Sequence, residues 1–322
     1  MLGWFGERFA ARGLRNGSDP ETADLAQPVQ GRPRRVLASD GTGLHVEILG
    51  PDDAPTIVLV HGYTNDQGTW HYQRRDLAGE FRVVSYDQRG HGASDEAVGG
   101  DYTMDALAGD LAAVLEACVP AGERVVVAGH SLGGMSALAL ADNHGELLGT
   151  RIAGLALVGT SGSDIVAGIL GAGMTGLQSL ATAVAPLVVG LRGRLGATPT
   201  DLTYLGIRAL TLSPQATPAH VAFTEGMSLA CPAPVRAALL PTFTSLDLTA
   251  AARQIAVPAL VIAGDRDRLT PLSSARALAD LLPDARLVEL PGVGHMAPLE
   301  AHETVTVHLR TFARQLLGHQ PV

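Results

Sequence analysis

Short apolar runs rich in β-branched residues alternate with longer segments whose apolar residues recur at helical spacing. Residues 56–60 (TIVLV) are almost wholly apolar, which is typical of a strand buried on both faces of a parallel sheet, and residues 82–86 (RVVSY) are interpreted as a second such strand. We predict strands at residues 35–39, 44–49, 56–60, 82–86, 124–128, 152–158, 259–263 and 285–290. We predict helices at residues 104–118 and 132–143, from near Pro271, and at residues 302–317. This alternation predicts an α/β fold, with a mostly parallel sheet covered by helices on both faces.

The alternation stops between Gly159 and about Leu248, where Gly, Ala, Leu and Thr dominate. Residues 165–191 carry no charged side chain, and an apolar run of that length would also suit a membrane-spanning helix. Glycines, Pro186 and polar residues interrupt the run, and a spanning helix could hardly rejoin the two strands of one sheet. We therefore predict a helical cap, or lid, at residues 161–247, inserted in a core of residues 34–160 and 248–322.

Residues 1–33 are predicted to form an N-terminal segment and linker. Residues 1–16 lack the apolar run and the small-residue cleavage site of a secretory signal, so a cytoplasmic location is expected. Four apolar side chains of this segment would share one face of a short basic amphipathic helix. Such a helix packs on the protein's own surface or makes weak contact with a membrane surface, and both readings stay open. The sequence predicts no particular oligomeric state.

The composition excludes several classes of function. The net charge of −9 opposes binding to nucleic acid or to an anionic membrane through bulk charge. All 23 basic residues are arginine, so a Schiff-base lysine, a Ser–Lys dyad and a P-loop lysine are all excluded. Cys118 and Cys231 are too few and too far apart for a disulfide framework or a zinc site, and we expect both to be buried.

A candidate nucleophile, Ser131, lies in the pentapeptide GHSLG, which matches the pattern G-x-S-x-G. A buried strand ends just before this pentapeptide and a small-residue helix follows it. A nucleophile at such a tight turn needs glycine neighbours, because side chains there would block the strained backbone. The start of the helix also favours the negative charge that develops during nucleophilic attack.

A candidate general base, His295, follows the last predicted strand in the motif GVGHM. Its position after the serine and the aspartates matches the chain order Ser…Asp…His. A carboxylate after the strand at residues 259–263 would hold the imidazole in the correct tautomer. We favour Asp267 for this role over Asp265, which is better suited to capping the turn or the next helix, and over Asp164, a distant third choice.

An oxyanion hole requires two backbone N–H groups directed at the developing negative charge. The N–H of Leu132, next to the candidate nucleophile, is one candidate. Tyr63 is the other, because it follows the His-Gly pair after the strand at residues 56–60. We expect His61 to brace this loop rather than to take part in chemistry.

These motifs resemble those of the α/β-hydrolase superfamily, within its lipase, esterase and haloperoxidase-like branch. The matching stretches are HGYTND, YDQRGHGAS, GHSLGG, GDRDRLTP and GVGHMAPLE, in the family's order between about residues 35 and 317. The resemblance implies a triad of Ser131, Asp267 and His295, with Tyr63 and Leu132 as oxyanion donors and no cofactor. It implies an architectural role for Arg89. Epoxide hydrolases and haloalkane dehalogenases of this fold have an aspartate where Ser131 stands, so the serine argues against those reactions.

The function expected from these residues is hydrolysis of carboxylic esters of lipophilic small molecules through an acyl-enzyme, by an esterase or a monoacylglycerol-lipase-like enzyme. The apolar cap is the reason to expect a lipophilic substrate. An acyltransferase, thioesterase, perhydrolase or C–C bond hydrolase would use the same triad and differ in pocket shape. A non-catalytic ligand receptor on the same fold is a third possibility, which the presence of all three triad residues argues against.

Overall fold

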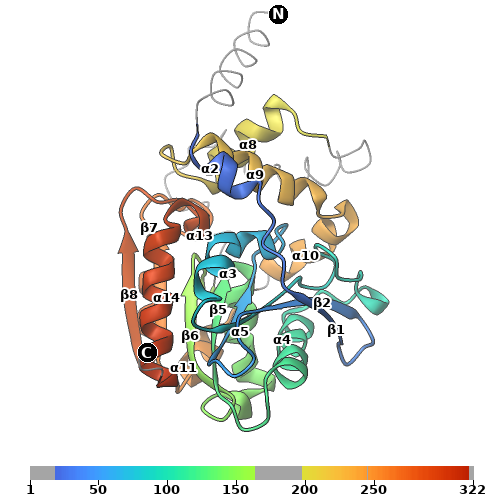
Figure 1. Cartoon of the computed structure of the whole chain (residues 1–322), viewed down its shortest axis with the longest axis vertical. Coiled ribbons are helices and arrows are strands. Elements are labelled where there is room, and N and C mark those ends of the chain that lie inside the picture. Colours follow the sequence, from blue (N-terminus) through green and yellow to red (C-terminus); the bar gives the residue numbers. More distant parts are fainter. Residues whose placement is uncertain (1–18, 164–197, 245, 319–322) are drawn as a thin grey trace, which may run out of the picture.

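The computed structural model describes residues 19–163, 198–244 and 246–318 (Figure 1). The sequence features at residues 1–16, Asp164 and residues 165–191 lie outside these ranges. Within the described ranges, eight strands form one sheet in the order β1-β2-β4-β3-β5-β6-β7-β8. Strand β2 is antiparallel to both of its neighbours, and the other pairs are parallel. The strands are β1 (Arg32–Leu37), β2 (Gly43–Leu49), β3 (Thr56–Val60), β4 (Arg82–Tyr86), β5 (Val125–His130), β6 (Ile152–Val158), β7 (Ala259–Gly264) and β8 (Ala285–Leu290).

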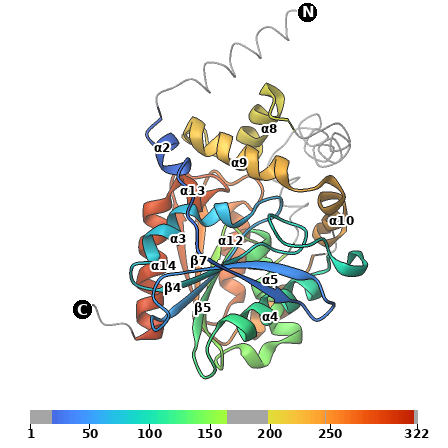
Figure 2. The same ribbon diagram turned by 45° about the vertical axis from the view of Figure 1, so that its right-hand side comes forward.

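Helices cover both faces of this sheet, as predicted (Figures 1 and 2). Those of the described ranges are α2 (Glu21–Leu25), α3 (His71–Leu77), α4 (Met104–Cys118), α5 (Leu132–Asn143), α8 (Asp201–Thr211), α9 (Pro218–Ala230), α10 (Ala233–Thr244), α11 (Thr249–Gln254), α12 (Leu272–Leu281), α13 (Ala297–Glu300) and α14 (His302–Leu317). Helices α4, α5, α11 and α12 contribute to the hydrophobic core on one face, and α3 and α14 to the core on the other. The predicted α/β fold class is therefore confirmed.

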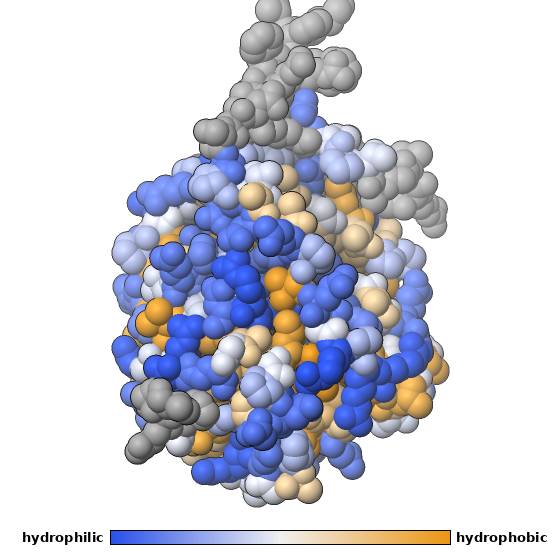
Figure 3. Space-filling view, viewed as in Figure 1, coloured by the Kyte–Doolittle hydropathy of each residue, from blue (hydrophilic) through white to orange (hydrophobic). Residues whose placement is uncertain are grey.

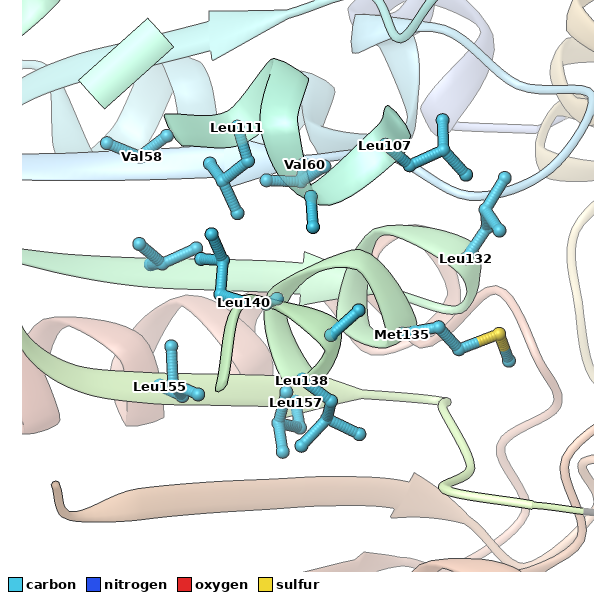
Figure 4. Close-up of a cluster of buried hydrophobic side chains, with 14 of the residues drawn as sticks. Val58, Val60, Leu107, Leu111, Leu132, Met135, Leu138, Leu140, Leu155 and Leu157 are labelled. Carbon is cyan, nitrogen blue, oxygen red and sulfur yellow. The ribbon is translucent and has the colours of Figure 1, made fainter. Parts of the chain in front are cut away.

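The helix after the candidate nucleophile is enclosed by apolar side chains (Figure 4). Leu132, Met135, Leu138 and Leu140 of α5 are fully buried, together with side chains from α4, β3 and β6. Removing one of these leucine side chains would cost about 2–5 kcal/mol, because the surrounding structure fills such a cavity only in part. The start of α5 is thus held firmly against the sheet.

Two strands, β1 and β5, differ from the predicted ranges by more than one residue at an end. Strand β5 continues to His130, two residues beyond the apolar run, because Gly129 and His130 still pair with Leu157 and Val158 of β6. Strand β1 begins at Arg32 instead of residue 35. It is an edge strand with mostly exposed side chains, so no apolar pattern marks its first residues. Hydrophobic patterning detects buried positions, so it misses strand ends made of polar residues or glycine.

Helices α8, α9 and α10 lie between β6 and β7 in the sequence and over one end of the sheet (Figure 2). The described residues 198–244 thus form helices between two strands of the sheet. The two chain ends of the insertion meet, since Ser163 pairs with Asp247 and the N–H of Leu248 donates to the carbonyl oxygen of Gly162 at 2.7 Å. The bounds 161–247 for a separate cap domain stay a prediction.

The described part of the predicted linker is attached to the rest of the protein instead of free. Asp19 accepts a hydrogen bond from the backbone N–H of Ala219, in the first turn of α9. Glu21 of α2 accepts one from the hydroxyl of Tyr72 in α3. Helix α2 buries no residue and is held by polar contacts, so hydrophobic patterning gave no sign of it.

The face of the molecule drawn in Figure 3 is mostly hydrophilic, with apolar side chains in small separate groups. Large apolar side chains that are clearly exposed occur singly, at Leu37, Val98, Leu202 and Val307. Single exposed apolar side chains are normal for a globular protein. Among the helices of residues 19–163, 198–244 and 246–318, none has both the length and the apolar character needed to span a bilayer.

A buried ion pair joins the loop after β4 to α4. Arg89 donates to both carboxylate oxygens of Asp110 at 2.7 Å, and both residues are almost completely buried. Arg89 also donates to Asp40 at 2.9 Å and to the carbonyl oxygen of Asp101 at 2.8 Å. The guanidinium thus ties three loops together, in line with its expected architectural role.

We predict that Asp110→Ala lowers the free energy of unfolding by about 3–5 kcal/mol, because the Arg89 guanidinium loses its buried counter-charge. Urea unfolding followed by circular dichroism measures the change. Glu116→Ala, at an exposed position of the same helix, is the matched control and should stay within about 0.5 kcal/mol of the wild type. Equal losses in the two variants would contradict the importance of the ion pair.

Candidate active site

Ser131 lies at a sharp turn between β5 and α5 and has the unusual backbone angles φ 51° and ψ −118°. A residue with a side chain in such a conformation carries strain of about 1–3 kcal/mol, and the surrounding structure must hold it. The N–H of Ser131 donates to the carbonyl oxygen of Val158 at 3.0 Å. The carbonyl oxygen of Ser131 accepts a hydrogen bond from the Thr160 hydroxyl at 2.8 Å. The turn is therefore held by β6 and by the residues that follow β6.

The glycines on either side of this turn are needed because main chain approaches them closely. A Cβ atom at Gly129 would overlap the backbone of Gly133, and one at Gly133 would overlap the carbonyl oxygens of Val60 and His61. The two glycines of the G-x-S-x-G pattern thus allow α5 to begin directly against the ends of β3 and β5. The structure supplies the steric reason that the motif suggested.

Asp267 and His295 are hydrogen-bonded to each other and both are buried. The Nδ1 atom of His295 lies 2.8 Å from Oδ2 of Asp267. The same carboxylate accepts hydrogen bonds from the N–H groups of Leu269 and Thr270, at 2.8 and 2.9 Å, and from the Thr270 hydroxyl at 2.7 Å. Because the carboxylate accepts, Nδ1 carries the proton and Nε2 keeps its lone pair.

Asp265, the less favoured aspartate, has a different partner. Its Oδ1 atom accepts a hydrogen bond from the N–H of Gly292 at 2.7 Å and so holds the turn after β8. The side chain of Asp265 is also partly exposed, whereas that of Asp267 is fully buried. The structure therefore brings Asp267, and not Asp265, to His295. The third choice, Asp164, lies outside the described residues.

The turn of Ser131 is linked to the loop of His295 through His130, the residue before the serine. The Nε2 atom of His130 donates to the backbone carbonyl oxygen of His295 at 2.9 Å, and the two imidazole rings lie 4.8 Å apart. Among the described residues, the Ser131 hydroxyl makes no hydrogen bond to His295. Hydrogen bonds of this kind are commonly loose in ligand-free enzymes and tighten when substrate binds.

The loop of Tyr63 lies beside the serine. A Cβ atom at Gly62 would come within 3.1 Å of the Ser131 Cβ atom, so the backbone of this loop contacts the turn directly. Within the described parts of the chain, the N–H groups of Tyr63 and Leu132 have no protein acceptor. The Tyr63 hydroxyl donates to the carbonyl oxygen of Arg236 in α10 at 2.8 Å, which ties the loop to the helical insertion.

Three fully buried histidines brace these loops as neutral imidazoles. Burial lowers the pKa of His61 to about 4 and the pKa values of His91 and His130 to about 3. His61 accepts a hydrogen bond from the N–H of Gln88 at 2.9 Å, as expected of a bracing residue. His91 accepts one from the N–H of Thr64 at 3.2 Å. Each histidine therefore orients backbone without adding charge near the serine.

The sequence analysis missed three residues that hold the site. His91 supports the loop of Tyr63, Thr270 supports Asp267, and Glu300 accepts hydrogen bonds from backbone N–H groups on both sides of His295. All three lie inside the motifs YDQRGHGAS, GDRDRLTP and GVGHMAPLE, so their proximity to the site was visible. Their hydrogen-bond partners were not, because each contact depends on side-chain direction.

Beyond this cluster, the described residues give no indication of a metal centre. Within residues 19–163, 198–244 and 246–318, no three His, Cys, Asp or Glu side chains are grouped as they would be around a metal ion. The two cysteines, Cys118 and Cys231, are buried, unpaired and distant in the sequence.

With this geometry in hand, comparison with known proteins places the chain in a family. A profile described as the alpha/beta hydrolase fold matches residues 55–302, and the chain belongs to that family. It is similar to the bifunctional esterase/perhydrolase DCH of Acinetobacter calcoaceticus, with 27% identity over 301 residues that cover 87% of this chain and 99% of the relative. The solved structure of a thermophilic esterase from Thermogutta terrifontis has a TM-score of 0.73 and 26% identity, covering 89% of this chain and 99% of the esterase.

A shorter similarity extends to epoxide hydrolase 1 of Caenorhabditis elegans, which is 29% identical over 141 residues. These residues are 44% of this chain, and they span only about a third, 34%, of the length of that relative. The family and the esterase relatives together support a hydrolase-fold enzyme, which agrees with the resemblance seen in the motifs.

We predict that acid destabilises the protein between about pH 6.5 and pH 4. The unfolded chain takes up protons at His61, His91 and His130 near their ordinary pKa of 6.5, whereas the folded protein does so only near pH 4 or 3. Unfolding therefore binds protons in this window, and the free energy of unfolding falls as the pH is lowered. Each histidine contributes up to about 1.4 kcal/mol per pH unit.

Urea unfolding at about pH 7, 6 and 5 measures this slope in the wild type and in His91→Gln. The variant retains a side-chain oxygen that can accept from the N–H of Thr64 but has no titrating group. We expect its free energy of unfolding to depend less steeply on pH than that of the wild type. Identical slopes would show that His91 is not held neutral by the fold.

Proposed function

We propose that the protein is a serine hydrolase that cleaves carboxylic esters of lipophilic small molecules through an acyl-enzyme. The observation that carries the proposal is the 2.8 Å hydrogen bond between Asp267 and His295, formed next to a serine in a strained turn. An aspartate that holds the Nδ1 proton leaves the Nε2 lone pair free to accept the proton of a nucleophilic alcohol. The esterase relatives support the same chemistry.

In the proposed mechanism, His295 removes the proton from Ser131 as the serine oxygen attacks the acyl carbon. The negative charge on the tetrahedral intermediate is stabilised by the N–H groups of Tyr63 and Leu132. The protonated His295, stabilised by Asp267, then gives its proton to the departing alcohol. A water molecule, activated by the same histidine, hydrolyses the acyl-enzyme and releases the acid.

The helical insertion supports a lipophilic substrate. Tyr63, the proposed oxyanion donor, has its ring in edge-to-face contact with Phe243 of α10 at 5.1 Å. The turn before α3 is close to Phe223 and Met227 of α9. The insertion thus places apolar side chains beside the proposed reaction centre, which favours an apolar acyl or alcohol group and excludes water.

A second candidate activity is perhydrolysis, in which hydrogen peroxide replaces water as the acceptor of the acyl group. It is favoured by one observation, the similarity over almost the full chain to a bifunctional esterase/perhydrolase. The acyl-enzyme would form in the same way in both activities. The two activities would differ only in the molecule, water or hydrogen peroxide, that attacks the acyl-enzyme. Measuring peracid formation with an ester and hydrogen peroxide, against acid formation in water, separates the two.

We predict that Ser131→Ala lowers kcat/KM by at least about 10³-fold on p-nitrophenyl esters of increasing acyl length, because the nucleophile is removed. A fluorophosphonate probe should label the wild type and leave the variant unlabelled. Intact thermal unfolding of the variant is the control for folding. A variant that keeps most of its activity, or a wild type that the probe does not label, would refute the proposed nucleophile.

The neighbouring aspartates offer a matched pair for the third proposed residue. Asp267→Asn should lower kcat by about 10⁴-fold, because an amide no longer stabilises the correct histidine tautomer or the imidazolium. Asp265→Asn removes a charge two residues away, where the side chain holds the turn at Gly292 and pairs with Arg266, and we expect its kcat to change by less than about tenfold. Steady-state kinetics on one ester tests both. A larger loss of kcat in Asp265→Asn than in Asp267→Asn would assign the orientation of His295 to Asp265 instead.

A further inference from the structure

The side chain of Glu300, at the end of α13, accepts hydrogen bonds from three backbone N–H groups. Its Oε2 atom lies 2.8 Å from the nitrogen of Ser213 and 3.2 Å from the nitrogen of Gly294. Its Oε1 atom lies 3.2 Å from the nitrogen of Met296. Gly294 and Met296 are the two neighbours of His295, so one partly buried carboxylate holds the loop on both sides of the histidine.

The third donor belongs to the helical insertion. Ser213 follows α8, and the carbonyl oxygen of Thr211, the last residue of α8, accepts hydrogen bonds from the N–H groups of His295 and Met296 at 3.0 and 3.2 Å. A Cβ atom at Gly294 would come within 2.5 Å of the Ser213 nitrogen, so the two backbones are in direct contact. The end of α8 and the histidine loop therefore form one hydrogen-bonded unit.

A single carboxylate is well suited to accept from all three donors. Carboxylate oxygens have lone pairs for several N–H groups, and hydrogen bonds to a charged acceptor are stronger than those between neutral groups. Gly294 and Met296 precede α13, and the N–H of Met296 is shared between Glu300 and the carbonyl oxygen of Thr211. A neutral amide at the same position would direct its own N–H groups at one or more of these donors.

We propose that Glu300 is a positioning residue that couples the helical insertion to His295 and so sets where the imidazole stands relative to Ser131. This inference rests on the proposed function, in which His295 is the general base. Glu300 does not touch the reacting atoms, because it acts through the main chain of the histidine loop. Small displacements of a reacting group of about 1 Å cost roughly 10²-fold in rate.

The test compares Glu300→Gln with Glu303→Gln, which removes a carboxylate at an exposed position three residues later, in the first turn of α14. We expect Glu300→Gln to lower kcat by about 10- to 100-fold with KM changed by less than about threefold, because the histidine is misplaced while ester binding is kept. The rate of labelling of Ser131 by a fluorophosphonate should fall in parallel. Glu303→Gln should match the wild type in both measurements.

Amide hydrogen exchange supplies a readout that does not depend on activity. In Glu300→Gln, we expect faster exchange in peptides that cover residues 211–213 and 292–296, and unchanged exchange in α14. Wild-type kcat in Glu300→Gln overturns the proposal, whether or not exchange is faster. A loss confined to KM also overturns it. A wild type that the probe does not label refutes the proposed function, whereas the exchange result still decides whether Glu300 joins the two segments.

A second variant covers the case in which Glu300→Gln does not fold. Glu300→Asp keeps the charge and withdraws it by one methylene group, so the three hydrogen bonds lengthen without loss of the anion. We expect an intermediate reduction of kcat, with a thermal unfolding temperature closer to that of the wild type. A folded Glu300→Asp protein with wild-type kcat and wild-type exchange would overturn the proposal.

Discussion

The close approach of main chain around Gly129 and Gly133 is the constraint on which the rest of the site depends. Helix α5 begins in direct contact with the end of β3, and any side chain at either glycine would overlap backbone atoms. The chain must therefore reverse direction within one residue, and Ser131 takes the strained conformation that this demands. Hydrogen bonds to β6 and to the residues after it hold that residue in place, so the conformation of Ser131 is a consequence of how tightly helix and sheet pack.

The site is braced mainly by neutral groups and by backbone. His61 and His91 orient the loops beside the serine, and His130 links the turn to the carbonyl oxygen of His295. Because burial keeps these imidazoles uncharged, they hold the loops in position without placing a further positive charge near the Asp267–His295 pair. The same burial makes the fold sensitive to acid, since unfolding releases three groups that then bind protons. The buried histidines that hold the loops near the serine are thus expected to make the protein less stable in acid.

The sequence alone predicted those features that depend on local patterns of apolar and polar residues. The buried strands β3 to β7 are apolar runs, and Tyr63, Ser131 and Asp267 each follow such a run. His295 follows β8, which is less buried. The carboxyl edge of the sheet was therefore predictable. Helix α3 was not, because several of its buried residues are polar: Gln73 and Arg74 find partners in distant segments. The attachment of residues 19–25 escaped notice for the same reason. Asp267 was favoured over Asp265 because Asp265 was expected to cap the turn or the next helix, and the structure adds a further physical difference, which is the burial of Asp267 next to His295.

The helical insertion is bonded to both sides of the candidate site. On one side, Tyr63 donates to the backbone of Arg236, and on the other, His295 donates to the backbone of Thr211. Both acceptors are carbonyl oxygens, so the contacts are retained when the side chains at those positions change. Side chains at these positions can therefore differ while the backbone of the insertion still holds the two loops of the candidate site. Replacing the whole insertion, by contrast, alters both loops at once, because their anchors belong to it. Point substitutions in the insertion thus leave these two backbone acceptors in place, whereas exchange of the whole insertion removes both at once.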